Sequence, residues 1–131
     1  MATATRPRRA AFAAFPLDDR TFTSLAQVFH LMGDESRLRI LLALARGREM
    51  HVSALCRMLN QSQPAVSHHL TLLRMAGLVG FRRVGKYNYY RVDAYMLGDL
   101  LERLFADAGR ANVINLGEYS LGLSRNPGRR R

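Results

Sequence analysis

The sequence is poor in cysteine and in acidic residues, and it contains no long apolar run. Its single cysteine, Cys56, has no partner for a disulfide within the chain, so nothing in the sequence requires an oxidising compartment. No apolar stretch approaches the roughly 18 residues that a membrane-spanning helix needs. The apolar run from Ala10 to Phe15 is too short for a signal peptide and is followed by Pro16 and two aspartates. These absences exclude an intrachain disulfide and an integral membrane protein, and we expect a cytoplasmic location.

The scarcity of acidic residues leaves the chain strongly basic. Twenty Lys and Arg against ten Asp and Glu give a formal net charge of +10, which favours a polyanionic partner such as nucleic acid or an anionic membrane surface. Seven of these charges lie near the two ends of the chain: Arg6, Arg8, Arg9, Arg125, Arg129, Arg130 and Arg131. These terminal charges fit either solvated arms or non-specific contacts to phosphate.

With 131 residues, 48% of them hydrophobic, the chain is long enough for one domain with a modest core. We expect a flexible basic arm over residues 1–17, a folded domain over 18–108 and a flexible basic tail over 109–131. The tail is expected because glycines recur and apolar periodicity fades from Gly109 onward.

Apolar residues recur at helical steps in five segments of the central region. The spacing predicts helices over residues 18–32, 34–45, 52–59, 62–77 and 94–108. Gly33 ends the first helix and Asp34 is placed to cap the second. In the second helix the spacing predicts a buried stripe of Leu38, Leu41, Leu42 and Ala45.

The 62–77 segment has the most specific pattern. Ser62 is placed to cap a helix, and Gly77 is placed to end it. One face is apolar, with Val66, Leu70 and Leu73 at helical spacing, while the opposite face is short, polar and initially uncharged. Such side chains near a helix N-terminus suit base edges in a DNA major groove. Only residues 60 and 61 separate this helix from the one before, which is the spacing of a helix-turn-helix, so we interpret it as a DNA-recognition helix.

Beyond Gly77 the apolar period changes to that of strands. The runs Leu78 to Arg83 and Tyr87 to Val92 are rich in Val, Phe and Tyr and predict a β-hairpin whose turn places Gly85 at a positive φ. Four basic residues lie on it: Arg82, Arg83, Lys86 and Arg91. A basic hairpin directly after a recognition helix is typical of a wing that follows the sugar-phosphate backbone. Its tyrosines are better suited to packing within the wing than to stacking on bases.

These faces predict two sets of DNA contacts and one protein interface. We expect contacts to bases from Gln63, Ser67, His68 and Thr71. We expect contacts to the DNA backbone from Ser62, Arg74, Arg82, Arg83 and Lys86. The wide apolar faces of the first and last helices predict a dimer interface formed by Phe22, Leu25, Phe29, Leu97, Leu101, Leu104 and Phe105. The alternative is that these apolar side chains pack within one subunit.

The remaining candidates for chemistry are a cysteine and several histidines. Cys56 lies on an apolar helix face and is more typical of a core residue than of a redox sensor. His30 and His51 are too isolated from carboxylates and thiols to predict a metal site. His68 is expected on the DNA face, whereas His69 is expected to pack or to bond the backbone. We therefore predict no metal site and no cofactor.

Three segments together resemble the ArsR family of winged helix-turn-helix regulators. The run from Gly33 to Leu41 resembles the family's second-helix entry, and Ser62 to Val79 resembles its SQxxVSxHLxxLxxAGLV run. The run from Gly85 to Arg91 resembles its wing strand, and the resemblance extends over about Leu25 to Phe105. It implies a homodimer that binds an inverted repeat near a promoter, usually represses, and releases the DNA when an effector binds.

The family's metal-sensing residues do not carry over to this chain. Where its arsenic sensors have Cys-x-Cys, this chain has His51-Val52-Ser53. Where its zinc sensors have Asp-x-His followed by His and Glu, the matching residues are Asp93, Tyr95, Ala106 and Gly109, so only the aspartate is retained. The sequence does not indicate which effector, if any, acts on this protein.

The sequence thus predicts a mainly α fold with a small β-hairpin, a winged helix-turn-helix of about five helices that dimerises through the first and last. The predicted function is sequence-specific regulation of transcription. The protein is expected to be a homodimeric ArsR-type repressor that binds double-stranded DNA and lacks the usual metal sites. The alternative is a winged-helix module that binds a protein and no specific DNA. An enzyme is disfavoured, because the chain has no glycine-rich phosphate loop, no paired carboxylates in a recognisable motif and no nucleophile with a base.

Overall fold

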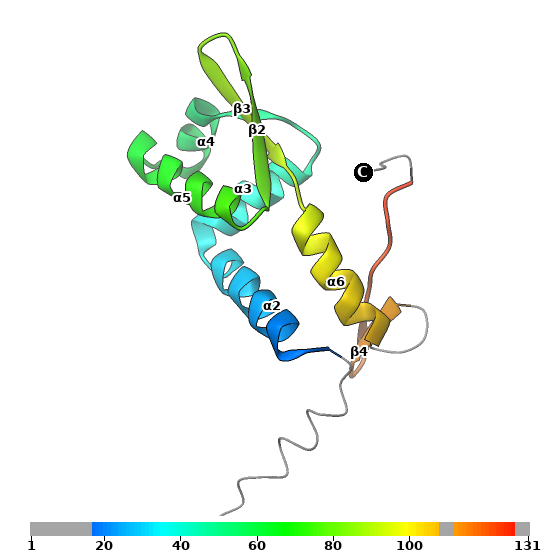
Figure 1. Cartoon of the computed structure of the whole chain (residues 1–131). Coiled ribbons are helices and arrows are strands. Elements are labelled where there is room, and N and C mark those ends of the chain that lie inside the picture. The colour runs from blue at the N-terminus through cyan, green and yellow to red at the C-terminus, as the bar shows by residue number, and fades with distance from the viewer. Residues whose placement is uncertain (1–16, 108–111, 128–131) are drawn as a thin grey trace, which may run out of the picture. The chain divides into compact units, whose positions relative to one another are not determined.

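A computed structural model describes residues 17–107 and 112–127 (Figure 1). The helices of these residues are α2 (Asp19–Met32), α3 (Glu35–Ala45), α4 (Val52–Leu59), α5 (Gln63–Met75) and α6 (Tyr95–Asp107). The strands are β1 (Met50–His51), β2 (Val79–Val84), β3 (Tyr87–Val92), β4 (Val113–Leu116) and β5 (Tyr119–Gly122). The chain divides into two compact units, one of residues 25–99 and one that combines residues 1–24 with 100–131. The predicted domain of residues 18–108 therefore extends over parts of both units.

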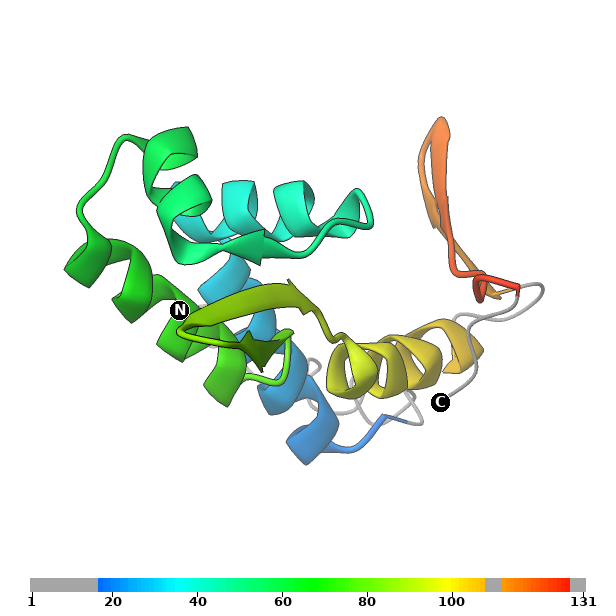
Figure 2. The same ribbon diagram turned by 90° about the horizontal axis from the view of Figure 1, so that it is seen from above.

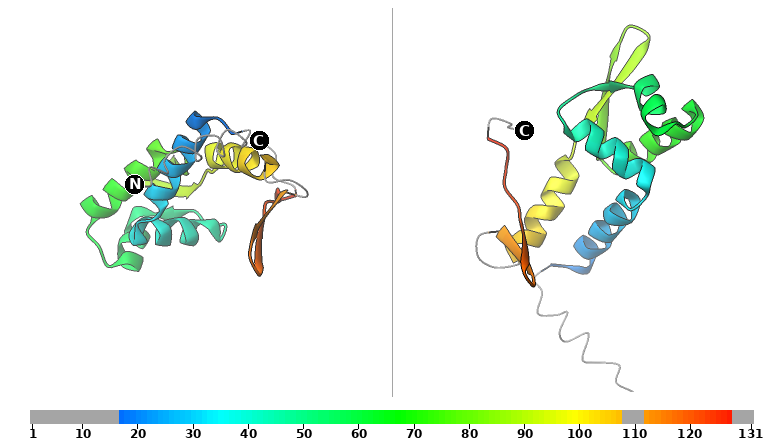
Figure 3. Two further views of the ribbon diagram at one scale, coloured as in Figure 1. Left: turned by 90° about the horizontal axis from the view of Figure 1, so that it is seen from below. Right: turned by 180° about the vertical axis from the view of Figure 1, so that it is seen from behind.

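The 25–99 unit packs three helices against a small antiparallel sheet. Helices α4 and α5 contact each other and α3, and a short loop joins them (Figure 2). The sheet has the strand order β1-β3-β2, and the β2–β3 hairpin extends beyond the helices of its unit (Figures 1 and 3). The largest fully buried side chains of the described residues lie in this unit: Ile40, Leu55, Val66, Leu70, Leu73 and Leu78. The predicted arrangement of a helix-turn-helix followed by a wing is confirmed.

The predicted signals at the helix ends are also present. The Asp34 carboxylate caps α3 by accepting a hydrogen bond from Arg37 N at 3.0 Å. The Ser62 hydroxyl oxygen caps α5 by accepting one from Ala65 N at 3.4 Å. Gly77 follows α5 with a φ of 70° and Gly85 occupies the wing turn with a φ of 61°, where a side chain would be strained. The local sequence therefore determines where α5 begins and where the hairpin turns.

The predicted buried stripe of α3 is partly wrong. The buried residues of α3 are Ile40, Leu41 and Leu44, whereas Leu38 and Leu42 are 41% and 59% exposed and Ala45 is exposed as well. Helix α3 carries an apolar residue at every position from 40 to 45, so two different faces satisfy the helical period. Contacts with α4, α5 and β3 select the face around Ile40.

Strand β1 was not expected from the sequence. It consists of two residues and pairs antiparallel with β3, with Met50 opposite Tyr90 and His51 opposite Tyr89. Two residues are too few to show a strand period, so only the pairing partner identifies this strand. The pairing attaches the N-terminal end of α4 to the middle of β3.

The prediction that residues 109–131 lack regular structure is wrong for part of that segment. Strands β4 and β5 form an antiparallel hairpin with Ile114 opposite Leu121, and Gly117 in its turn has a φ of 65°. In the same unit Arg125 forms an ion pair with Glu102 of α6 at 2.6 Å. Two strands of four residues with mostly exposed side chains show little apolar alternation, which is why the sequence pattern missed them. Residues 1–16 of the predicted arm, and residues 109–111 and 128–131 of the predicted tail, lie outside the described residues.

Among the described residues, no helix is both long and apolar enough to cross a lipid bilayer.

Candidate nucleic-acid interface

The two faces of α5 differ as the sequence predicts. Val66, Leu70 and Leu73 are buried and fix the helix to its unit. On the opposite face the side chains of Gln63, His68 and Thr71 are exposed, and Ser67 between them is half-buried. A face of short hydrogen-bonding groups is therefore presented to solvent by a helix whose other face is fixed in the core.

The N-terminal half of this face meets the wing at a small cavity of about 150 Å³. Gln63 and Ser67 of α5 line it together with Lys86 of the wing turn. Asn88 and Tyr90 of β3 and the start of α4 complete the lining. Three of the predicted DNA-contact residues, from two separate elements, thus surround one polar cavity.

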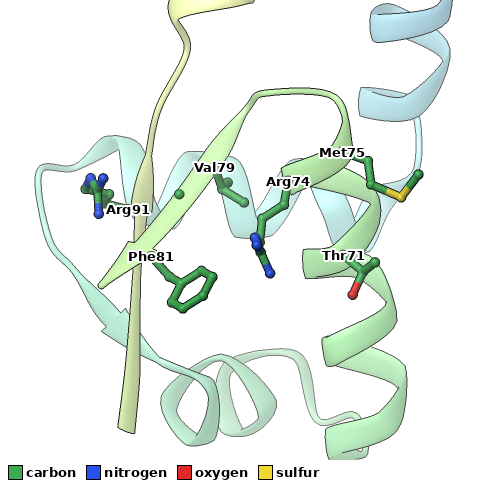
Figure 4. Close-up of a pocket in the computed structure, with 7 residues that line it drawn as sticks. Thr71, Arg74, Met75, Val79, Phe81 and Arg91 are labelled. Carbon is green, nitrogen blue, oxygen red and sulfur yellow. The ribbon is translucent and has the colours of Figure 1, made fainter. Parts of the chain in front are cut away.

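The C-terminal half of α5 meets β2 at a second cavity, of about 560 Å³ (Figure 4). Thr71 and Arg74 of α5 line it with Phe81 of β2 and Arg91 of β3. The Thr71 hydroxyl donates a hydrogen bond to Ser67 O at 2.9 Å, so its oxygen keeps free lone pairs. The Arg74 guanidinium carbon lies 4.3 Å from the centre of the Phe81 ring, a cation–π contact that orients the charge.

The other predicted backbone contacts differ in how far they are engaged within the protein. Arg82 forms an exposed ion pair with Glu49 at 2.6 Å, and Arg83 Nε donates to the Gly85 carbonyl at 3.1 Å. Lys86 is exposed and has no ion pair within the part of the chain that the structure describes. An exposed pair such as Arg82–Glu49 contributes little stability, so a phosphate can replace the carboxylate at low cost.

His51 has a structural role that the sequence did not reveal. Its Nδ1 accepts a hydrogen bond from Ser53 N at 3.2 Å and so caps α4. Its ring contacts the edge of the Tyr87 ring with centroids 4.6 Å apart, in line with the expected packing of the wing tyrosines. Histidine is an uncommon cap, which is why the sequence pattern did not identify it. Within residues 17–107 and 112–127 no group of three or more His, Cys, Asp or Glu is arranged to hold a metal ion.

His69 and Cys56 are both partly covered. The His69 Nδ1 atom is buried without a hydrogen-bond partner and lies 3.9 Å from an oxygen of Asp34. The expected packing of His69 is present, but this nitrogen makes no backbone hydrogen bond. The pKa of Asp34 is lowered chiefly by the hydrogen bond from Arg37 N, with a smaller contribution from His69. Cys56 is half-buried on α4.

The predicted dimer-interface residues are covered to different degrees in the single chain. Phe29 is 49% exposed, whereas Leu25 and Phe105 are only 4% and 6% exposed. The others are half-buried: Phe22, Leu97, Leu101 and Leu104. Phe29 is therefore the predicted interface residue with the largest exposed fraction.

Comparison with known proteins places this arrangement in a family. A model of the bacterial regulatory proteins of the arsR family matches residues 34–80, which extend from the cap of α3 through α5 into β2. The transcriptional repressor SdpR of Bacillus subtilis is 31% identical over 94 residues, which are 72% of this chain and 97% of that protein. The chain belongs to the ArsR family.

Other relatives match a shorter part of this ArsR-family chain. The arsenical resistance operon repressor of Escherichia coli is 44% identical over 70 residues, 53% of this chain and 60% of that protein. The alignment thus spans less than two thirds of that relative. Among solved structures, reduced HlyU from Vibrio cholerae is similar with a TM-score of 0.56 and 31% identity, over 66% of this chain and 94% of that one. These relatives are regulators of transcription and not enzymes, and the HlyU likeness supports the winged helix-turn-helix fold.

Proposed function

We propose that this ArsR-family protein is a cytoplasmic, DNA-binding repressor of transcription that acts as a homodimer on an inverted repeat. The observation that carries the proposal is the polar cavity where Gln63 and Ser67 of α5 meet Lys86 of the wing. An amide and a hydroxyl group that can bond base edges lie there beside a cation that has no ion pair among the described residues. DNA likewise presents base edges next to phosphates.

In this proposal α5 enters the major groove and its exposed face reads bases. The Gln63 amide and the hydroxyls of Ser67 and Thr71 supply the donors and acceptors that discriminate base pairs, and the His68 ring adds a further polar edge. The backbone contacts come from Ser62, Arg74, Arg82, Arg83 and Lys86. The Ser62 oxygen accepts a bond from the helix, and its hydroxyl hydrogen remains available to a phosphate. Basic residues within 1–17 add non-specific attraction to DNA.

Dimerisation through α2 and α6 would present two copies of α5 to the two halves of an operator. The exposed Phe29 ring supports such an interface, because burying a large aromatic side chain is favourable. The half-buried Leu97, Leu101 and Leu104 of α6 supply further apolar surface. In the proposed dimer these side chains would be buried against the partner subunit.

We further propose that DNA binding is independent of the family's thiolate and zinc sites. The support is the residue content, because His51-Val52-Ser53 replaces the Cys-x-Cys of arsenic sensors and α6 contains no histidine.

Fluorescence anisotropy tests the proposal directly. Labelled DNA from upstream of the protein's own gene and a scrambled duplex of equal composition are titrated at physiological salt, with and without a chelator. Tighter binding to the upstream DNA, unchanged by chelator, is expected. Equal weak binding to both duplexes would contradict the proposal and would favour a winged-helix module that binds another protein.

A further inference from the structure

A groove of about 890 Å³ lies between α3, β1 and α4, within the 25–99 unit and apart from the face of α5. Charged and apolar residues line it together, and the larger part of the lining surface is apolar, with Leu42 from α3, Met50 from β1, and Ala54 and Met58 from α4. The volume and the mainly apolar lining are typical of sites for small organic molecules.

The groove leaves large apolar side chains exposed on two of its walls. Leu42 is 59% and Met58 is 42% exposed. The helical spacing predicts Leu42 in the core, but the structure turns it toward the groove. Covering these side chains removes apolar surface from water, and methionine adapts its shape to different aliphatic ligands.

The charges at the groove favour an anion. Arg39 is paired with Glu35 at 2.8 Å and Glu49 is paired with Arg82 at 2.6 Å. Arg46 and Arg48 also line the groove, and neither has an ion pair within the described part of the chain. Arginine is suited to bind a carboxylate through two parallel hydrogen bonds. An aliphatic lining beside two available guanidinium groups matches an aliphatic chain that ends in a carboxylate.

We propose that this groove binds a small aliphatic carboxylate and that this ligand weakens DNA binding. The second part rests on the proposed function as a DNA-binding repressor.

The groove is connected to the DNA face through His51. This residue lines both the groove and the polar cavity that contains Gln63 and Lys86, and its strand β1 pairs with β3 of the wing. A ligand that shifts Met50 and His51 therefore moves a wall of the DNA-facing cavity. Its negative charge also reduces the attraction between the basic surface and phosphate. Both effects lower the affinity for DNA.

Isothermal titration calorimetry of the full chain with decanoate, below its micelle concentration and without DNA, tests the site. The double variant Arg46→Gln/Arg48→Gln removes the two cations, and Ala54→Leu narrows the groove. Arg57→Gln is the matched control, because Arg57 is exposed on α4 and does not line the groove. We expect one decanoate per chain for the wild type and the control, and binding weaker by about tenfold in both groove variants, since a charge-assisted contact or the apolar fit is lost. Neutral 1-decanol should bind the wild type more weakly than decanoate does.

Equal decanoate affinity in all four proteins, or no decanoate binding by the wild type, would contradict the proposed binding site. Because the double-arginine variant changes only surface charges, its result holds even if Ala54→Leu unfolds.

Fluorescence anisotropy with DNA then tests the effect of the ligand on DNA binding. Decanoate should weaken operator binding by the wild type and leave operator binding by the double variant unaffected. Decanoate binding at the groove with unchanged DNA affinity would overturn the regulatory part. Decanoate binding by a protein that shows no DNA preference would contradict the proposed function and support the site.

Discussion

Arg74 of α5 lies over the ring of Phe81 in β2, the first wing strand, with its guanidinium carbon 4.3 Å from the ring centre (Figure 4). The contact joins the two elements that are proposed to hold DNA, and it restricts where the Arg74 charge can lie. A cation held in place loses less conformational freedom when it meets a phosphate.

Replacing Phe81 with Leu should therefore weaken DNA binding without removing a charge. An exposed cation–π contact contributes about 0.5–1 kcal/mol, so we expect an affinity loss of about two- to fivefold. The slope of log K against log salt should stay unchanged in Phe81→Leu, whereas Arg74→Gln should reduce it by about 0.9. Anisotropy titrations at several salt concentrations measure both quantities. A reduced slope in Phe81→Leu would contradict this role of the ring.

The proposed division between base-reading and backbone-binding residues predicts different losses of DNA affinity for different variants. Ser67→Ala/His68→Ala should lower operator affinity by about 1–3 kcal/mol per lost base contact and leave binding to scrambled DNA nearly unchanged. Lys86→Gln should weaken binding to both duplexes and reduce the salt slope. Competition titrations with the two duplexes distinguish these outcomes. Equal losses on both duplexes in the Ser67/His68 variant would place α5 outside the major groove.

Asp34 provides a prediction for stability and pH. Removing the cap in Asp34→Ala should lower the free energy of unfolding by about 1 kcal/mol, while Asp34→Asn keeps an accepting oxygen and should lose less. The hydrogen bond from Arg37 N lowers the pKa of Asp34 below its ordinary value of 3.8 in the folded state. A lowered folded-state pKa stabilises the protein at pH values above 3.8, and this contribution is lost as the pH falls toward the lower folded-state value. Urea unfolding at pH 7 and at successively lower pH values should show the difference between wild type and Asp34→Asn shrinking with acid.

Leu55 and Leu42 form a matched pair that tests which apolar residues of α3 and α4 lie in the core. Leu55→Ala should cost about 2–5 kcal/mol, because the side chain is fully buried. Leu42→Ala should change stability by less than about 0.5 kcal/mol, because the side chain is largely exposed. Thermal and urea unfolding of both variants provide the comparison. A large loss in Leu42→Ala would mean that this residue is covered in solution.

Phe29 tests the proposed dimer. A charge at this position should be costly in an apolar interface, so Phe29→Asp should shift the protein toward a monomer. Leu38→Asp is a control with a similarly exposed apolar residue on a helix outside the proposed interface. Sedimentation velocity at several concentrations measures the mass of each variant. A wild-type protein that remains monomeric at all concentrations would contradict the dimer.

The parts of the fold that the sequence predicted are those with strong local signals. Ser62, Asp34, Gly77 and Gly85 each satisfy a backbone requirement that few other residues meet, so the helix ends and the wing turn follow from the sequence. The buried face of α5 also follows from the sequence, because its apolar residues recur with the helical period and polar residues occupy the other face.

The features that the sequence missed depend on tertiary contacts. The exposed Leu42 lies in a helix with too many apolar residues for the period to choose a face. The two-residue strand β1 exists only through its pairing with β3. For the same reason the groove beside Leu42 was not foreseen, since it brings together residues of α3, β1 and α4. The His51 cap is a local contact, and it was missed because histidine is an uncommon cap.

The central claim is that two copies of this chain read an inverted repeat through α5. The most direct measurement is the stoichiometry and affinity of binding to the selected upstream duplex and to the same duplex with one half-site scrambled, by sedimentation and anisotropy. The account predicts two chains on the intact duplex and a large loss of affinity when one half-site is scrambled. One chain per duplex, with an affinity that does not change when a half-site is scrambled, would contradict it.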